Sequence, residues 1–144
     1  MPTLLIFAPC EKIIIDKAGS FSLIGLMESI SVSSPAGAVI PQDAVGPKEW
    51  AVFCQWQMRE GESTRPFSQV LQILWPDQRE FKKAIVQLPL EDSKFKQIHI
   101  NIMGLPVGQQ GKLTLNLWLE LDSNRVTDIF FKTVDIAHAQ ETGK

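Results

Sequence analysis

The chain has 144 residues, of which 44% are hydrophobic and 21% charged, and its formal net charge is −2. A chain of this length and composition can bury a core of its own, which predicts a single globular domain and excludes extensive disorder. The slightly acidic balance excludes a global attraction to nucleic acid or to an anionic membrane. No apolar run approaches the roughly 20 residues that span a bilayer as a helix, so we expect no membrane partner.

The first residues indicate a cytoplasmic protein. No basic residue precedes the apolar run at 4–8, and this run is shorter than the roughly 7–15 residues of a signal-peptide core. In the cytoplasm Cys10 and Cys54 stay reduced. Export by another route would allow a bridge between them, and two cysteines without a spacing signature leave both states open.

In chain order, the first predicted strands are residues 4–16 and 21–32. A β-branched run favours the first strand, and Gly19 suits a hairpin turn between the two. Apolar residues on both faces of the second strand predict a central strand or a bulge near Gly25. Residues 33–48 contain three prolines and are predicted as a long connection that crosses between two sheets, as in Greek-key folds.

The rest of the chain alternates between apolar and polar residues. We predict further strands at 50–58, 67–75, 80–88, 94–103, 112–122 and 125–136. The clearest is 112–122, where leucine occupies every second position, so that one face is buried and the other faces water. The same alternation places Trp50, Trp56 and Trp75 in the core.

These strands predict an all-β protein, an eight-stranded antiparallel two-sheet β-sandwich of immunoglobulin-like or jelly-roll-like Greek-key type. The leucines of 112–122 need a second apolar layer, and we expect the other strands to supply it. The predicted domain spans residues 1–136. Residues 137–144 lack an apolar period and are predicted to form a flexible C-terminal tail.

Two segments, APCEKIIIDKAGSFSLIGLMESI near the start and LPVGQQGKLTLNLWLELDSNRV near the end, resemble an uncharacterised bacterial family of small β-sandwich proteins. In that family a strand, a short turn and an SLIG strand open the domain, and a G-x-x-x-L-x-L strand with a short turn lies near its close. Residues 33–93 add nothing to the resemblance. It implies a β-sandwich in the bacterial cytoplasm, and it carries over no catalytic residue.

The sequence offers few groups for catalysis or metal binding. We expect His99 to face solvent on a strand and His138 to lie in the tail, with a base or metal-ligand role for His99 as the weaker alternative. No pair of residues has metal-ligand spacing, and carboxylates at turns bond their own backbone more often than they bind calcium. We therefore expect no cofactor, no metal and no enzymatic activity.

A basic cluster has the composition of a nucleic-acid face. It consists of Arg79, Lys82, Lys83, Lys94 and Lys96, interleaved with Phe81 and Phe95. Pairing of the strands 80–88 and 94–103 in a hairpin would bring these lysines together. Lysine on an outer strand is also the ordinary protection against edge-to-edge aggregation, and the acidic net charge argues against nucleic acid as a partner.

Trp118 is the main candidate for a binding residue. The alternation that buries the leucines of 112–122 exposes Trp118, with Asn116 and Thr114 on the same face. Tryptophan is enriched where protein partners bind. The structural alternative is a loop or the C-terminal tail that covers the ring.

These features support three hypotheses. The leading one is a non-enzymatic binding or assembly module that associates with itself or with another protein through the outer sheet face of Trp118. The alternative is small-ligand or carbohydrate binding at a loop end formed by residues 33–48, 59–66 and 104–111, which requires a concave pocket with convergent polar groups. The third is a hydrolase that uses His99 with a nearby carboxylate.

Overall fold

A computed structural model describes residues 1–140, which form ten β-strands and no helix. The strands are β1 (Thr3–Ile15), β2 (Phe21–Leu26), β3 (Ser29–Ser34), β4 (Val45–Gln57), β5 (Ser68–Leu74), β6 (Glu80–Gln87), β7 (Phe95–Pro106), β8 (Gly111–Leu121), β9 (Asn124–Arg125) and β10 (Phe130–Gln140). Since the described residues include no helix, none could cross a membrane as one. The all-β prediction is confirmed.

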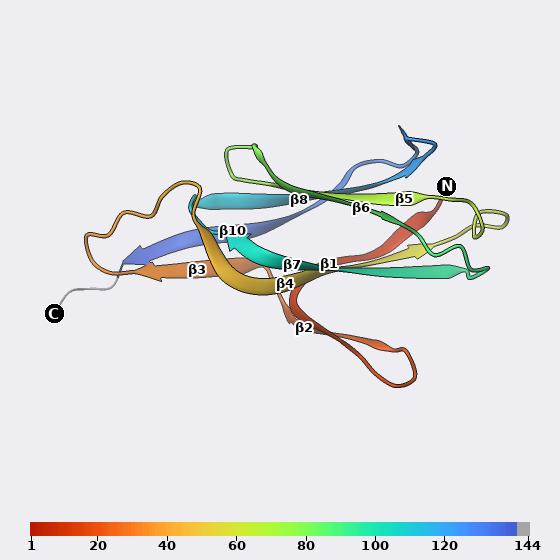
Figure 1. Ribbon diagram of the computed structural model, residues 1–144, viewed down its shortest axis with the longest axis horizontal. Helices are drawn as coiled ribbons and strands as arrows, with labels where there is room; N and C mark the ends of the chain where they lie inside the picture. The colour runs from red at the N-terminus through yellow and green to blue at the C-terminus, as the bar shows by residue number, and fades with distance from the viewer. Residues whose placement is uncertain (141–144) are drawn as a thin grey trace.

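The strands form two sheets. In Figure 1, β8, β5 and β6 of one sheet lie above β1, β4 and β7 of the other. Sheet A has four strands in the order β2-β1-β4-β7. Sheet B has six, in the order β3-β10-β8-β5-β6 with β9 paired to β8. The prediction of two sheets is confirmed, and the predicted number of eight strands is wrong.

The strand count differs by two, because the predicted strand 125–136 is the short β9 followed by β10, and because the predicted strand 21–32 is two strands in two sheets. The chain leaves sheet A after β2, turns at Met27 and Glu28, and enters sheet B as β3. The amide N–H of Met27 donates to the Pro9 carbonyl oxygen at 2.9 Å, and that of Asp135 donates to the Glu28 carbonyl oxygen at 3.0 Å. This corner therefore ties the two sheets together.

The expectation of purely antiparallel pairing is wrong at one place. Strand β3 runs parallel to the end of β10, from Asp135 beside Ser29 to Gln140 beside Ser34. This pairing extends β10 beyond the domain end predicted at residue 136, because β3 offers the edge of sheet B as a template. It corrects the predicted tail for residues 137–140, and the remainder of that tail lies outside the described residues.

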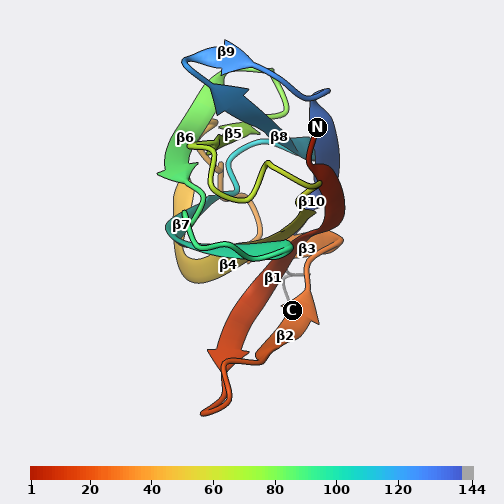
Figure 2. The same cartoon turned by 90° about the vertical axis from the view of Figure 1, so that its right-hand side faces the viewer.

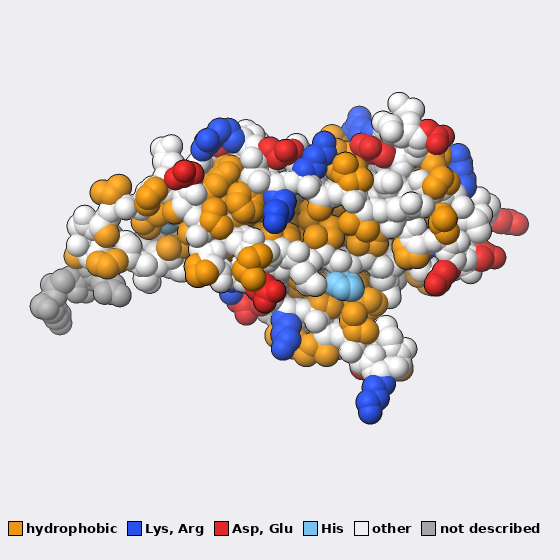
Figure 3. Space-filling view, in the orientation of Figure 1, with side chains coloured by type: hydrophobic (Ala, Val, Ile, Leu, Met, Phe, Trp, Pro, Cys, Tyr) orange, Lys and Arg blue, Asp and Glu red, His pale blue; other side chains and the backbone are white. Residues whose placement is uncertain are grey.

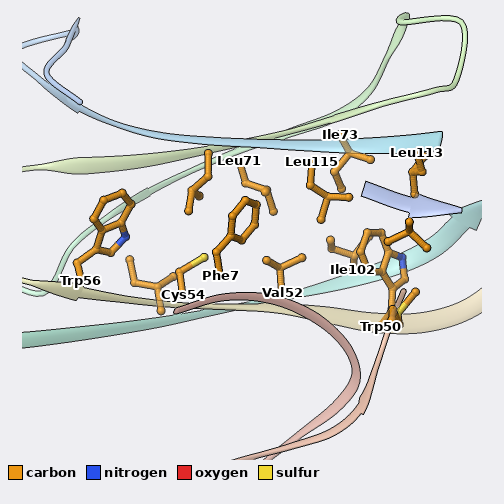
Figure 4. Close-up of a cluster of buried hydrophobic side chains, with 14 of the residues drawn as sticks. Phe7, Trp50, Val52, Cys54, Trp56, Leu71, Ile73, Ile102, Leu113 and Leu115 are labelled. Atoms are coloured by element: carbon orange, nitrogen blue, oxygen red, sulfur yellow. The ribbon is translucent and has the colours of Figure 1, made fainter. Parts of the chain in front are cut away.

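The core lies between the facing sides of the two sheets. Four leucines of β8, Leu113, Leu115, Leu117 and Leu119, are completely buried, as their spacing predicts. Figure 4 shows Phe7, Val52 and Trp56 pointing from sheet A toward the leucines and isoleucines of sheet B. Trp50, Trp56 and Trp75 are buried as well, which confirms their assignment to the core.

A two-stranded ribbon, residues 11–26, projects from this core (Figure 2). Strand β1 pairs with β4 from Thr3 to Cys10 and with β2 from Cys10 to Ile15, so its second half leaves the plane shared with β4. In Figure 3 hydrophobic side chains are visible on this projecting part.

Candidate functional site

The outer face of sheet B carries the residues that the alternation of β8 turns away from the leucines. Trp118 lies directly opposite Val70 of β5, and Asn116 lies opposite Gln72. On the next strand, Ile85 of β6 lies opposite Val70. Ile85, Val70 and Trp118 therefore form an apolar row across β6, β5 and β8. Gln72 and Asn116 belong to a polar row beside it.

Trp118 is half-buried and held in place by two charged side chains. Its indole Nε1 donates a hydrogen bond to Glu120 Oε2 at 2.9 Å. The Lys83 ammonium lies over the ring, 5.8 Å from its centroid, in a cation–π arrangement. Val70 beside it is fully buried, and the two side chains that contact the Trp118 ring come from the sheet itself.

The polar row links three strands by side-chain amides. Asn116 Nδ2 donates to Gln72 Oε1 at 3.3 Å, and Gln72 Nε2 donates to Glu80 Oε1 at 3.1 Å. Thr114, half-buried, lies opposite Thr133 of β10. These bonds hold the polar side chains in place on the sheet surface.

Exposed apolar side chains lie on both sides of Trp118. Phe131 of β10, directly opposite Asn116, is 67% exposed, and Ile85 is 61% exposed. Ile129, just before β10, is 48% exposed. Sequence reasoning missed these residues, although an outward Phe131 follows from the same alternation that buries Val134 and Ile136.

The basic residues do not form the predicted cluster. Strand β6 pairs with β5, and β7 pairs with β4 in the other sheet, so the expected hairpin of β6 and β7 is wrong. Arg79 is bound to Asp77 at 2.7 Å, and Lys83 lies over Trp118. Figure 3 shows Lys and Arg side chains scattered over this side with Asp and Glu side chains between them. Lys82 and Lys94 remain exposed.

Lys96 has a structural role. It is only 3% exposed, because position 96 points to the same side of β7 as the buried Ile98. Its Nζ donates to the carbonyl oxygens of Pro89 and Glu91. Lys96 therefore fixes the loop between β6 and β7 and is not available to a polyanion.

The predicted loop end divides into two regions. Residues 33–48 and 104–111 meet, since the amide N–H groups of Val107 and Gly108 both donate to the Ala44 carbonyl oxygen, at 3.0 and 3.1 Å. Residues 59–66 lie at the opposite end of the sheets and contact Asp92 through Ser63 (Figure 1). The prediction of one joint site from all three loops is therefore wrong.

An open cavity of about 650 Å³ lies where the first two loops meet, and it is mostly polar. Its wall includes Ser34, Gln109, Gln110 and His138. His138 Nε2 lies 2.6 Å from the Val107 carbonyl oxygen, which can only accept, so Nε2 carries the proton. The His138 amide N–H donates to Gln110 Oε1 at 3.0 Å. These bonds tie the loop to β10.

Asp77 lies at the rim of this cavity and is committed to its own turn. Its carboxylate accepts from the Arg79 backbone N–H at 3.0 Å, from Arg79 Nε at 2.7 Å and from Gln109 Nε2 at 3.1 Å. These bonds, the backbone bond first, lower the pKa of Asp77. The charged carboxylate therefore serves to join the β5–β6 turn to the β7–β8 loop.

His99 is exposed on the outer face of sheet A, as predicted. Its neighbours are aromatic: it lies opposite Phe53, and the Phe21 ring lies 5.8 Å away. Among residues 1–140 no carboxylate is hydrogen-bonded to it, and no group of three or more His, Cys, Asp or Glu side chains could hold a metal ion.

The two cysteines are free and buried. Burial raises the pKa of the Cys54 thiol to about 12 and also raises that of Cys10, so neither is a reactive thiolate. Cys54 lies opposite Phe7 and Cys10 opposite Ala51, an offset of about 10 Å along the strands. That exceeds the roughly 7 Å a disulfide can bridge.

A comparison of the chain with models of known protein families finds no match, and no curated protein matches it either. The resemblance of the two terminal segments to a bacterial β-sandwich family stays a prediction.

Proposed function

We propose that the protein is a non-enzymatic binding or assembly module that docks a protein partner, in the first place a second copy of itself, through the outer face of sheet B. The observation that supports this most is the exposure of Phe131, at 67%, beside the half-buried Trp118. Covering a large exposed aromatic side chain is favourable, and aromatic residues dominate the energetics of protein interfaces.

The arrangement around Trp118 favours a protein partner. The ring is already oriented by Glu120 and Lys83, so little side-chain freedom would be lost on binding. Charges of both signs flank the apolar row, since Lys83 lies over the Trp118 ring and Glu120 accepts a hydrogen bond from it. A mixed rim around an apolar centre is typical of interfaces, and mixed charge suits a two-fold contact of identical surfaces.

Trp118→Ala is expected to weaken this association without unfolding the domain. Interface tryptophans that act as anchors cost about 2 kcal/mol or more when truncated, roughly 30-fold in dissociation constant. Sedimentation equilibrium at several concentrations should give a lower mass for the variant than for the wild type. The matched control is Met103→Ala, which removes a side chain that is 63% exposed on β7 of the other sheet. Equal masses for wild type and Trp118→Ala would contradict the proposal.

The cavity beside His138 favours a second candidate function, the binding of a small polar ligand or a carbohydrate. The Nδ1 atom of His138 and the Nε2 atom of Gln110 have no protein partner among the described residues, and both residues line the cavity. A shift in melting temperature with a panel of sugars and metabolites, lost in Gln110→Ala, is the expected result. No shift with any of them counts against this function.

The finer description of the molecule is part of the proposal. We infer that the two sheets form a β-sandwich of immunoglobulin-like or jelly-roll-like type, as the core shared between them suggests. We place the protein in the bacterial cytoplasm, where buried thiols stay reduced.

A further inference from the structure

The ribbon carries apolar side chains that the rest of the molecule leaves uncovered. Ile24 lies opposite Lys12 and Ile14 opposite Ser22, so both isoleucines share one face of the ribbon. On this face Leu26 is 63%, Ile24 45% and Ile14 41% exposed. The outer edge of β2 has no strand partner in the described part of the chain. A two-stranded ribbon is marginally stable by itself, and a free apolar edge is a template for further strands.

A seam lined mainly by apolar residues lies between β1 and β10. In Figure 2 these two strands stand on the opposite side of the molecule from β6 and β7. Within the described residues, positions 3–8 of β1 pair only with β4, and positions 130–134 of β10 pair only with β8. Each strand therefore presents a free edge to the seam. The seam is lined by Leu4, Leu5, Phe7, Ile129, Phe130 and Phe131, with Lys132 as its one charged residue, and encloses about 390 Å³.

The seam and the ribbon are continuous. A second hollow of about 170 Å³ shares Phe7 and Lys132 with the seam and reaches Leu26 at the base of the ribbon. Apolar side chains thus occur from Leu5 and Phe7 in the seam to Leu26 and Ile24 on the ribbon, with Lys132 where the two hollows meet. The corner at residues 27–28 closes the seam at the end where the ribbon begins, because it bonds to both sheets.

We propose that two copies of the chain associate reciprocally, the ribbon of each lying along the seam of the other and adding its β2 edge to a free edge there. A chain cannot fill its own seam, since its ribbon points away from the body (Figure 2). The ribbon of a second copy is an apolar strand with a free edge, which can fill the seam of the first. The seam of the second copy can hold the ribbon of the first in the same way. Such self-complementary contacts are what a two-fold axis generates.

The dimensions of the two parts agree. Strand β2 has six residues, about 20 Å at 3.3 Å a residue, and the free stretch of β1 at 3–8 has the same length, because the Pro9 carbonyl oxygen already accepts from Met27. Backbone hydrogen bonds would supply the affinity, and apolar side chains on alternate positions would fill the seam, as in other cases of strand addition. An extended peptide of a different protein is the competing occupant, and the experiment below separates the two.

The test uses Trp118→Ala chains, so that contacts through the outer face of sheet B are weakened. We expect this background to remain a dimer of twice the 16.1 kDa chain mass in sedimentation equilibrium, and the wild type, which has both contacts, to exceed that mass. Adding Ile24→Lys on the ribbon, or Leu5→Lys on the seam, should each halve the mass. The control is Val39→Lys, at a side chain 89% exposed in the β3–β4 loop, and it should leave the dimer intact.

Complementation is the decisive part. A mixture of the Ile24→Lys chain and the Leu5→Lys chain should dimerise again, because the intact ribbon of the second fits the intact seam of the first. A contact of ribbon with ribbon or of seam with seam would not be restored in this way. A monomeric Trp118→Ala background, or a mixture that stays monomeric, overturns the proposal. Neither result tests the proposal for the outer face of sheet B, which is tested separately by the mass difference between wild type and Trp118→Ala.

Discussion

Replacing Leu115 with alanine is expected to lower the free energy of unfolding by about 2–5 kcal/mol. Leu115 is completely buried in the middle of β8, and Figure 4 shows it pointing toward Phe7 and Val52 of sheet A. Truncation removes its apolar contacts and leaves a cavity between two sheets that are each held by their own hydrogen bonds and cannot collapse onto it. Urea denaturation followed by circular dichroism measures the loss as a lower midpoint with an unchanged slope.

Leu90→Ala is the matched control for this experiment. Leu90 is 51% exposed in the loop between β6 and β7, so its truncation should change stability by no more than about 0.5 kcal/mol. If the two variants lose similar stability, the core does not lie where we describe it, between the leucine face of β8 and the inner side of sheet A.

Gly108→Ala is expected to destabilise the domain by about 1–3 kcal/mol. A Cβ atom at this position would lie 2.2 Å from the Pro41 carbonyl oxygen and 2.5 Å from that of Gln42. Both are backbone atoms, so the loop of residues 35–44 must move, and the bond from the Gly108 amide to the Ala44 carbonyl would be lost with it. The same denaturation experiment measures the cost.

Gly46→Ala controls for the change of residue type. Its nearest neighbours would lie 3.8 Å from an added Cβ, which is ordinary contact, so the variant should be close to the wild type in stability. A Gly108→Ala protein as stable as Gly46→Ala would show that the β3–β4 loop does not rest on the β7–β8 loop.

Much of the fold follows from alternation along single strands. The burial of Leu113 to Leu119, and of Ile98 and Ile102 with His99 exposed between them, depends only on which side each residue faces. The division of residues 21–32 into β2 and β3 does not follow from alternation, because both halves have the composition of a strand. The turn between them is fixed by a hydrogen bond that Met27 donates to Pro9 and one that Glu28 accepts from Asp135, and no local pattern contains these distant partners.

The candidate site was predictable to a similar extent. Alternation alone puts Trp118 on the outer face of sheet B, but its neighbours Ile85 and Phe131 come from strands whose place in the sheet the sequence does not specify. The prediction of a basic cluster is wrong for the same reason, since β6 and β7 are consecutive in the sequence but belong to different sheets. Lys96 shows a further limit, because a long lysine can bury its stem while its ammonium bonds carbonyl oxygens.

His138 was assigned to a tail because residues 137–144 have no apolar period. In the structure it continues the inner side of β10 beyond Val134 and Ile136, at the open end of the space between the sheets. A polar residue in an inward position can mark a strand end that faces a cavity. The sequence does not predict this position of His138, because the parallel pairing of β10 with β3 joins segments more than a hundred residues apart.

The most direct test of the central claim is sedimentation equilibrium of the wild-type protein and Trp118→Ala over a range of concentrations. We expect a wild-type mass well above the 16.1 kDa of one chain and a lower mass for the variant, while the two proteins have the same circular dichroism spectrum. A wild type that is a monomer throughout, or a variant of the same mass as the wild type, would contradict the claim that the outer face of sheet B is a docking surface.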